Sequence, residues 1–303
     1  FVNIPTTITP LITPALISLL FALISLPYWI RRSTEHKLLI TDAQKIPKRK
    51  VAHLAGIIVI PSAVIGILSF IAIQSFYKQD VTNQATLLAA ISTILFALII
   101  GLIDDLLGEK IGLRQYQKPL LMLLAALPMV VINAGKNMMT IPLIGPIILG
   151  NWYPFIIVPL AITCASNGFN MLAGLNGLEA GMGIIILGTL GTISLTTSHL
   201  PSAIIAFCTV CALIPFFIHN KHPARILPGN GFTYAIGATI AVVAIVGDSE
   251  RSALILFTPY FFELILKLKG VMQKESLARP LANGSLANQY PNWYSLNHIT
   301  ISL

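Results

Sequence analysis

Runs of about 20 apolar residues recur along this chain of 303 residues, and they restrict its fold more than any other feature. Each run is long enough to cross the hydrocarbon core of a bilayer as a helix. Only 10% of the residues are charged and the mean hydropathy is +0.82, whereas a soluble domain carries roughly 25% charged residues. The short alternating segments typical of a membrane β-barrel are not seen in the sequence. We therefore predict an all-α, polytopic integral membrane protein with a single domain over residues 1–303.

The apolar pattern predicts nine transmembrane helices, and a tenth that begins near Ser295. The predicted spans are 8–30, 53–76, 86–103, 118–134, 152–166, 181–197, 201–218, 232–247 and 252–268. A further apolar piece at 140–149 is too short to cross a bilayer and contains Pro142, Gly145 and Pro146. We expect a lid or a re-entrant turn there.

Positive charge divides the loops into two sets. The loops 31–52, 104–118 and 219–231, together with the tail from Lys267, hold sixteen of the nineteen Lys and Arg residues. The opposite loops hold Lys78, Lys136 and Arg251. By the positive-inside rule the first set faces the cytoplasm and the N-terminus lies outside. The net charge of +8 then indicates contact with membrane lipids rather than with nucleic acid.

Two adjacent acids, Asp104 and Asp105, end the third predicted span on the cytoplasmic side. A helix C-terminus carries the negative end of the macrodipole, which disfavours carboxylates. The pair therefore needs a cation, which is either a metal ion or the side chain of Lys110, Arg114 or Lys118. Two interpretations stay open for the acids: a solvated interfacial cap, or a metal or general-base site. Lys118 either extends toward the interface or binds a phosphate.

The polar stretch NGFNMLAGLNGLEAGMG begins at Asn167 and connects two apolar spans. By the same charge rule it lies on the cytoplasmic side, as Asp104 and Asp105 do. Asn170 and Asn176 offer amide oxygens, which are hard ligands suited to Mg²⁺. Gly174 lets the backbone approach a ligand closely, and Glu179 suits the start of the following helix. The stretch is either a ligand-binding loop or a tight re-entry turn.

A third polar segment, HNKHPARILPGNGF, connects the seventh and eighth predicted spans. Asn220 is polar, and Arg225 has the planar guanidinium that clamps phosphate in a bidentate manner. Asn230 is either a ligand or simply the N-cap of the next helix. Together, the three segments indicate a phosphorylated ligand held with Mg²⁺ at the inner membrane surface, where one substrate is a lipid. Phosphoryl transfer fits, because it requires mainly a metal, cationic clamps and positioning.

The motifs NMLAGLNGLEAG, DDLLG, TDAQKIP and HNKHPARILPGNGF resemble those of the polyprenyl-phosphate N-acetylhexosamine-1-phosphate transferases. The resemblance covers nearly the whole chain and is greatest to the eukaryotic and archaeal dolichyl-phosphate GlcNAc-1-phosphotransferases. It implies transfer of GlcNAc-1-phosphate from UDP-GlcNAc, or from another UDP-HexNAc, to a polyprenyl or dolichyl phosphate, with release of UMP. It also implies Mg²⁺ or Mn²⁺ as the cofactor, a first step in lipid-linked glycan assembly, and a homodimer as one expected assembly.

The resemblance also implies roles for individual residues. Asp104, Asp105 and Lys118 would be catalytic, and Asn170 and Asn230 would hold the metal. With the polar residues of the segments above included, the expected substrate-binding residues are His53, Asn167, Gly174, Asn176, Glu179, Asn220, Arg225 and Arg279. Asn176 and Glu179 would lie on the uridine and sugar side. Arg279 would belong to a last cytoplasmic loop that closes over the sugar and diphosphate.

Two positions depart from the family pattern. Asn230 stands where the family has a metal-binding aspartate, so we expect weaker metal binding because a neutral ligand replaces a charged one. His53 stands where the eukaryotic branch has an acid.

A membrane transporter of a phosphorylated or lipid-linked substrate is the alternative. Transporters often keep a charged residue near the midplane and show inverted repeats. Only Glu263 lies inside a predicted span, four residues before Lys267, where we expect an i, i+4 ion pair. An intramembrane aspartyl protease would need two facing acids in its spans. Release of UMP distinguishes the transferase from both.

Overall fold

A computed structural model describes residues 9–43, 45, 48–136, 138–142 and 144–302, with the side chains at 109 and 110 excepted. The chain is mostly helical, as predicted. The longer helices are α1 (Thr9–Glu35), α2 (Gly56–Ile73), α3 (Gln84–Ile111), α4 (Gln117–Ala125), α6 (Val158–Met171), α7 (Leu178–Thr196), α8 (Leu200–Asn220), α9 (Asn230–Val246) and α11 (Thr258–Lys269). The shorter ones are α5 (Leu127–Val131), α10 (Glu250–Leu256), α12 (Leu296–Ser302) and two π-helical segments, η1 (Gln74–Lys78) and η2 (Tyr153–Ile157).

Each of the nine predicted spans overlaps at least one of these helices. Six helices are long and apolar enough to cross a membrane: α1, α2 with η1, α3, η2 with α6, α7 and α8. The segments 117–131 and 230–246 are shorter apolar helices, and the ninth predicted span is divided into α10 and α11. Length and composition thus support six spans, and the number nine to ten stays a prediction.

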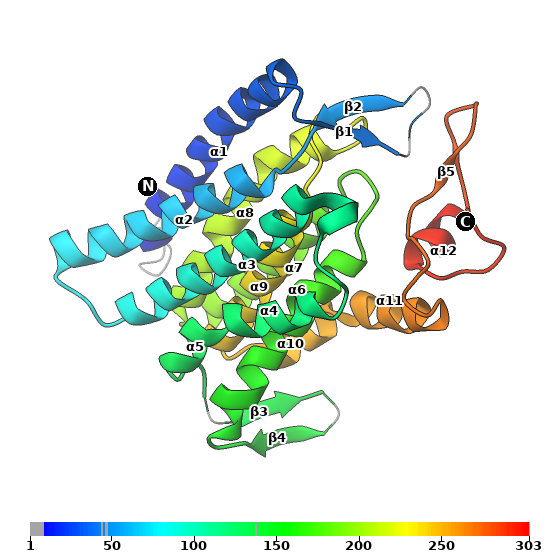
Figure 1. The fold of residues 1–303 in the computed structure, drawn as a ribbon. Helices are drawn as coiled ribbons and strands as arrows, with labels where there is room; N and C mark the ends of the chain where they lie inside the picture. The colour runs from blue at the N-terminus through cyan, green and yellow to red at the C-terminus, as the bar shows by residue number, and fades with distance from the viewer. Residues whose placement is uncertain (1–8, 44, 46–47, 137, 143, 303) are drawn as a thin grey trace.

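Three short antiparallel hairpins were not predicted. They are β1 (Leu39–Asp42) with β2 (Arg49–Ala52), β3 (Met138–Ile141) with β4 (Gly145–Ile148), and β5 (Arg279–Pro280) with β6 (Leu286–Ala287). The segment 140–149 is not a helix but forms most of the β3–β4 hairpin, in agreement with its being too short for a span, and its role as a lid stays a prediction. Figure 1 shows β1–β2 and the C-terminal segment on the side where α3 ends, and β3–β4 at the bottom.

The centre of the bundle is α9, in which every residue from 231 to 245 is buried. A helix that is apolar on all sides lies inside a bundle rather than at its surface. Glycines allow its neighbours to approach closely: a Cβ at Gly101 in α3 would lie 2.5 Å from the carbonyl oxygen of Asn230. A Cβ at Gly237 in α9 would lie 2.5 Å from the carbonyl oxygen of Ala165 in α6. Small residues at such contacts are typical of packed membrane helices. The first turn of α9 is thereby packed closely against α3, and its middle against α6.

Candidate active site

Asp105, in the last turn of α3 before the non-helical Gly108, caps the first turn of α9. Its Oδ1 accepts a hydrogen bond from the backbone N–H of Asn230 at 2.9 Å, and its Oδ2 accepts one from Gly231 at 3.0 Å. The positive end of the α9 dipole stabilises this carboxylate. Gly229 has φ +79°, and a Cβ there would lie 2.7 Å from Asp105 Oδ2. The chain therefore needs glycine at the point where α9 begins.

Asp104 is buried and accepts hydrogen bonds at both oxygens. Its Oδ1 accepts the backbone N–H of Leu113 at 3.0 Å, and its Oδ2 accepts the side-chain amide of Asn230 at 2.9 Å. The ammonium of Lys118 lies 2.7 Å from the same Oδ2. The two acids that the α3 dipole disfavours are thus stabilised differently, Asp104 by a lysine and Asp105 by a helix N-terminus. Two of the three polar segments predicted to form the site thus meet here, together with Lys118.

Asn170, the other predicted metal ligand, approaches α9 from the C-terminal turn of α6. Its Oδ1 accepts a hydrogen bond from the hydroxyl of Thr233 at 2.7 Å, and Thr233 lies one turn beyond Asn230. Thr233 was not predicted as a site residue. Asn167 donates instead to the carbonyl of Thr163 in its own helix, at 2.9 Å. Asn170 is therefore joined through Thr233 to the first turn of α9, which Asp105 caps, whereas Asn167 bonds only within α6.

The loop between α6 and α7 is fixed by hydrogen bonds to its backbone. The backbone N–H of Gly174 donates to Glu179 Oε1 at 2.9 Å, and that of Gly177 donates to Asn220 Oδ1 at 3.0 Å. Asn220 is fully buried, and its side-chain N–H₂ donates to the carbonyl of Ile226 at 2.9 Å. Asn220 and Glu179 thus hold the loop in place, while their direct contact with a substrate stays a prediction.

The β1–β2 hairpin adds a carboxylate that the sequence analysis did not assign to the site. Asp42 is buried at the end of β1, and its Oδ2 accepts a hydrogen bond from the side-chain amide of Asn176 at 3.2 Å. The ammonium of Lys45 lies 2.6 Å from the same oxygen. Asp42 belongs to the motif TDAQKIP, so its position in a recognisable motif was the signal that could have identified it.

The hairpin also pairs with the segment that precedes α9. The backbone N–H of Ala52 donates to the carbonyl of Arg225 at 3.2 Å, and that of Leu227 donates back to Ala52 at 2.9 Å. His53 directly follows Ala52 in the chain. Burial lowers the pKa of its imidazole, and the nearby Asp105 carboxylate partly offsets this effect. The side chain of Arg225 is exposed on the same segment.

The C-terminal segment reaches the site loop through Asn297. This buried side chain donates to the carbonyl of Ala173 at 3.3 Å and to that of Ser276 at 3.4 Å. Arg279 lies exposed on β5, where its strand pairs with Ala287. The structure thus brings the base of this segment, rather than Arg279 itself, against the loop.

Glu263 does not form the expected pair with Lys267 within the described residues. Its Oε2 accepts hydrogen bonds from the hydroxyl of Ser295 at 3.1 Å and from the backbone N–H of Leu296 at 2.7 Å. Lys267 donates to the carbonyl of Lys274 at 2.8 Å. The expectation of an i, i+4 ion pair was therefore wrong, because turns beyond α11 supply partners that sequence spacing does not reveal.

The candidate metal donors are oxygen atoms of two carboxylates and two amides. In the described part of the chain, no three His, Cys, Asp or Glu side chains are grouped so that they could hold a metal. Asp104, Asp105, Asn170 and Asn230 instead provide the hard oxygen donors that Mg²⁺ prefers. Each Asp105 oxygen accepts one of the two hydrogen bonds described above and keeps lone-pair capacity. This donor set fits a divalent cation with oxygen ligands.

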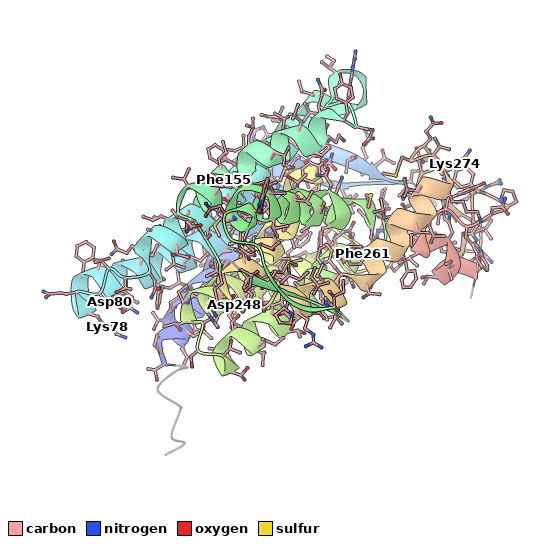
Figure 2. All side chains as sticks on the ribbon, turned by 90° about the horizontal axis from the view of Figure 1, so that it is seen from below. Lys78, Asp80, Phe155, Asp248, Phe261 and Lys274 are labelled. Carbon is pink, nitrogen blue, oxygen red and sulfur yellow. The ribbon has the colours of Figure 1, made fainter. Side chains whose placement is uncertain are left out.

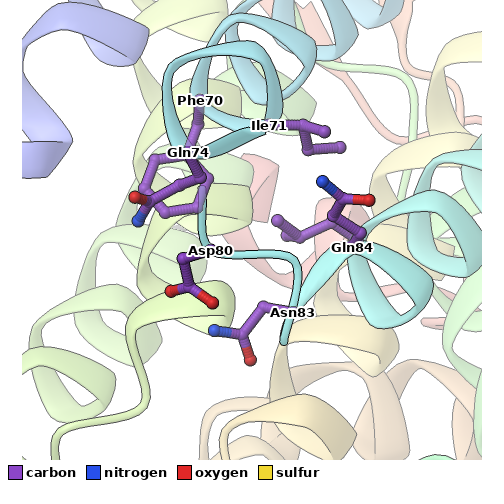
Figure 3. A pocket seen from close by; sticks show the side chains of 7 residues that line it. Phe70, Ile71, Gln74, Asp80, Asn83 and Gln84 are labelled. Carbon is purple, nitrogen blue, oxygen red and sulfur yellow. The ribbon is translucent and has the colours of Figure 1, made fainter. Parts of the chain in front are cut away.

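Two pockets lie apart from these residues. The smaller one lies where η1 leads into α3, and Figure 3 shows Gln74, Asp80, Asn83 and Gln84 around it. The larger is an apolar hollow of about 740 Å³ between α3 and the α4–α5 pair. None of the predicted site residues lines either pocket.

The helical bundle and the site define an integral membrane enzyme whose polar centre is assembled from loops at one end. The chain belongs to glycosyl transferase family 4, whose model matches residues 87–248. A Saccharolobus solfataricus protein is 35% identical over 98% of this chain and 89% of its own length. It carries the provisional name UDP-N-acetylglucosamine–dolichyl-phosphate N-acetylglucosaminephosphotransferase.

Two more distant relatives cover less of the chain. A Dictyostelium discoideum protein with the same enzyme name is 27% identical over 73% of this chain and 61% of its own length. A phospho-N-acetylmuramoyl-pentapeptide-transferase of Halalkalibacterium halodurans is 30% identical over 70% of this chain and 66% of its own length.

Proposed function

We propose that this protein transfers GlcNAc-1-phosphate from UDP-GlcNAc to a polyprenyl phosphate such as dolichyl phosphate. An oxygen of the acceptor phosphate forms a bond to the sugar-bearing phosphorus of the donor. The bond from that phosphorus to the oxygen bridging the two donor phosphates breaks, and UMP leaves with that oxygen. The observation that carries the proposal is the meeting of Asp104, Asp105, Lys118 and Asn230 at one point. The names of the relatives supply the donor and the acceptor.

The side chains of the site position and neutralise charge. A phosphate monoester has a second pKa of about 6, so the acceptor is already largely dianionic at neutral pH. It therefore requires orientation and cationic neighbours more than a strong base. Lys118, which neutralises Asp104, would provide one positive charge beside the phosphates. Asp105 is held rigidly by two backbone N–H groups of α9, so its free lone pairs keep a fixed direction.

Mg²⁺ or Mn²⁺ would be held by Asp105, Asn170 and Asn230, with Asp104 beside them. When bound, such an ion supplies neutralisation of the diphosphate charge. We further propose nine to ten spans, with the N-terminus outside and the site in the cytoplasm. The site residues lie in the basic loops, which the positive-inside rule assigns to the cytoplasmic side. The reaction would then begin lipid-linked glycan assembly, in a monomer or a homodimer.

The experiment is a donor and acceptor assay with purified protein. UDP-[³H]GlcNAc, dolichyl phosphate and Mg²⁺ are expected to give a radiolabelled lipid and an equimolar amount of UMP. Asp105→Asn is expected to reduce turnover at least 100-fold, because one α9 N–H then faces an amide N–H₂. Asp80→Asn, in an exposed loop beyond η1, is the matched control.

A relative acts on a muramoyl-pentapeptide substrate by name, so the UDP-linked muramoyl-pentapeptide is the second donor to test. Lipid product from that donor alone would replace the GlcNAc assignment. Uptake of UDP-GlcNAc into proteoliposomes without UMP would support the transporter alternative and overturn the transferase proposal.

A further inference from the structure

Asp42 and Asn176 form a contact between two loops that lie far apart in the sequence. The amide nitrogen of Asn176 lies 3.2 Å from Asp42 Oδ2, and Lys45 Nζ lies 2.6 Å from the same oxygen. Asp42 is 3% exposed, whereas Asn176 is half-buried. The carboxylate is thus held in place by a lysine, and the amide retains an accessible face.

The chemistry of this contact fixes the orientation of the amide. An ionised carboxylate can only accept hydrogen bonds, so it requires the N–H₂ group of Asn176 rather than its carbonyl oxygen. The Oδ1 of Asn176 must therefore point away from Asp42. Among the described residues, none donates a hydrogen bond to that oxygen.

The backbone around Asn176 is also held in place. Asn220 accepts the N–H of Gly177 at 3.0 Å, and Asn297 donates to the carbonyl of Ala173 at 3.3 Å. A fixed amide on a fixed loop presents its acceptor in one direction. Such preorganised acceptors discriminate between ligands because a mismatched partner leaves a polar group unpaired.

We propose that Asp42 is a positioning residue that locks the Asn176 amide so that its carbonyl oxygen faces the base of the nucleotide donor. This inference rests on the proposed function. A fixed acceptor favours a base edge with an N–H donor, as at N3 of uracil, over cytosine, whose N3 is an acceptor. Without the lock, the amide can rotate and present N–H₂, which suits cytosine. Asp42 therefore sets selectivity for the base without touching the substrate.

The test compares UMP and CMP binding to purified full-length protein by calorimetry, beside turnover with UDP-GlcNAc. Asp42→Asn is expected to weaken UMP binding about tenfold and to narrow the ratio of UMP to CMP affinity by a similar factor. The KM for UDP-GlcNAc is expected to rise more than kcat falls. Asp42→Glu, which keeps an acceptor-only carboxylate, should retain the preference for UMP. Asp80→Asn is the control for loss of an aspartate elsewhere.

The double variant Asp42→Asn/Asn176→Asp exchanges donor and acceptor across the contact. It should bind UMP better than either single variant, because the hydrogen bond is restored and an acceptor still faces the base. Asn176→Ala should lose the preference for UMP, and it keeps the test valid if Asp42→Asn fails to fold.

An unchanged ratio of UMP to CMP affinity in Asp42→Asn, or in Asn176→Ala, would overturn the inference. So would a double variant that is no better than the singles. The binding measurements need no turnover, so this failure is separate from failure of the proposed function. The latter would appear as wild-type protein that makes no lipid product from UDP-GlcNAc.

Discussion

Asn230 is the residue at which the chemistry of the site can be changed most directly. Its amide N–H₂ donates to Asp104 Oδ2 at 2.9 Å. In Asn230→Asp a second carboxylate faces Asp104 at this distance, and the ammonium of Lys118 neutralises only one of the two. The lost hydrogen bond costs on the order of 1–3 kcal/mol when no metal ion lies between the carboxylates. We expect a lower Tm without metal, and a larger increase in Tm on adding Mg²⁺ than wild-type protein shows.

The same variant should need less Mg²⁺ for half-maximal turnover, because a charged ligand replaces a neutral one. Asn151→Asp, at an exposed position just before η2, is the control and should leave both quantities unchanged. An unaltered Mg²⁺ requirement in Asn230→Asp would mean that Asn230 lies outside the metal site.

The sequence predicted which residues need a partner where a charged side chain stands at an unfavourable position. Two acids at a helix C-terminus required a partner, and Lys118 was among the three basic residues considered. The other partner, the N-terminus of α9, is 125 residues away from Asp105 in the chain. No local pattern reveals a contact of that kind, and Asp42 with Asn176 is equally remote. Sequence therefore indicated which groups needed partners more readily than which partners they have.

At the scale of helices, close packing of α9 controls the site. A Cβ at Gly101 would lie 2.5 Å from the carbonyl oxygen of Asn230, so Gly101→Ala must displace the first turn of α9. Overpacking of this kind typically costs about 1–3 kcal/mol, and turnover should fall more than tenfold because Asp105 loses its hydrogen bonds. A Cβ at Gly188 in α7 meets nothing within 4 Å. Gly188→Ala is therefore the control, with Tm and turnover measured for both variants.

The C-terminal segment depends on a buried carboxylate in α11. Glu263 is 0% exposed and accepts the backbone N–H of Leu296 at 2.7 Å and the hydroxyl of Ser295 at 3.1 Å. In Glu263→Gln a neutral amide oxygen replaces the carboxylate as the acceptor of these hydrogen bonds, which weakens them, so α12 should pack less firmly against α11. We expect faster proteolysis between 270 and 294 and a higher KM for UDP-GlcNAc.

Glu275→Gln is the control for this change, because Glu275 is exposed on the same segment. Equal proteolysis of the two variants would contradict a role for Glu263 in docking the segment.

Helices were predicted better than hairpins for a physical reason. A span requires a long apolar run, and this signal is present in the composition of each window. Strands of two or four residues, such as β5 and β1, carry little periodic information. The bounds were less accurate where polar residues continue a helix: α3 extends to Ile111 rather than ending near 103.

At the scale of the whole molecule, hydrogen bonds divide the loops into two groups. Lys136 contacts Asp248, and Tyr153 at the start of η2 contacts Glu250 at the start of α10. These contacts join the loops at one end of α9. The hairpin β1–β2, the α6–α7 loop and the segment before α9 are joined separately, at the other end of α9. Figure 2 shows Lys78 and Asp80 far from Lys274, in agreement with two polar ends. The charge pattern also divides the loops into two sets, and which set faces the cytoplasm stays a prediction.

Cysteine labelling tests both the orientation and the number of spans. In a background with Cys164, Cys208 and Cys211 replaced by alanine, an impermeant maleimide is added to intact cells. We expect labelling of Asp80→Cys and protection of Lys221→Cys until the cells are permeabilised, because the basic loops face the cytoplasm. The opposite pattern of labelling would show that the predicted orientation is wrong. The site would then face away from the nucleotide sugars of the cytoplasm.

Labelling at two further positions tests whether the two shorter apolar helices, 117–131 and 230–246, cross the membrane. The segment Asn230–Val246 extends about 25 Å at 1.5 Å per residue, against a hydrocarbon core of about 30 Å. Because α9 is enclosed by protein rather than by lipid, it can cross without matching the full thickness. Arg251→Cys, which follows α9, and Asn151→Cys, which follows α4 and α5, should therefore be labelled in intact cells. Protection of either position would show that the preceding short helix does not cross, and the predicted nine spans would have to be reduced.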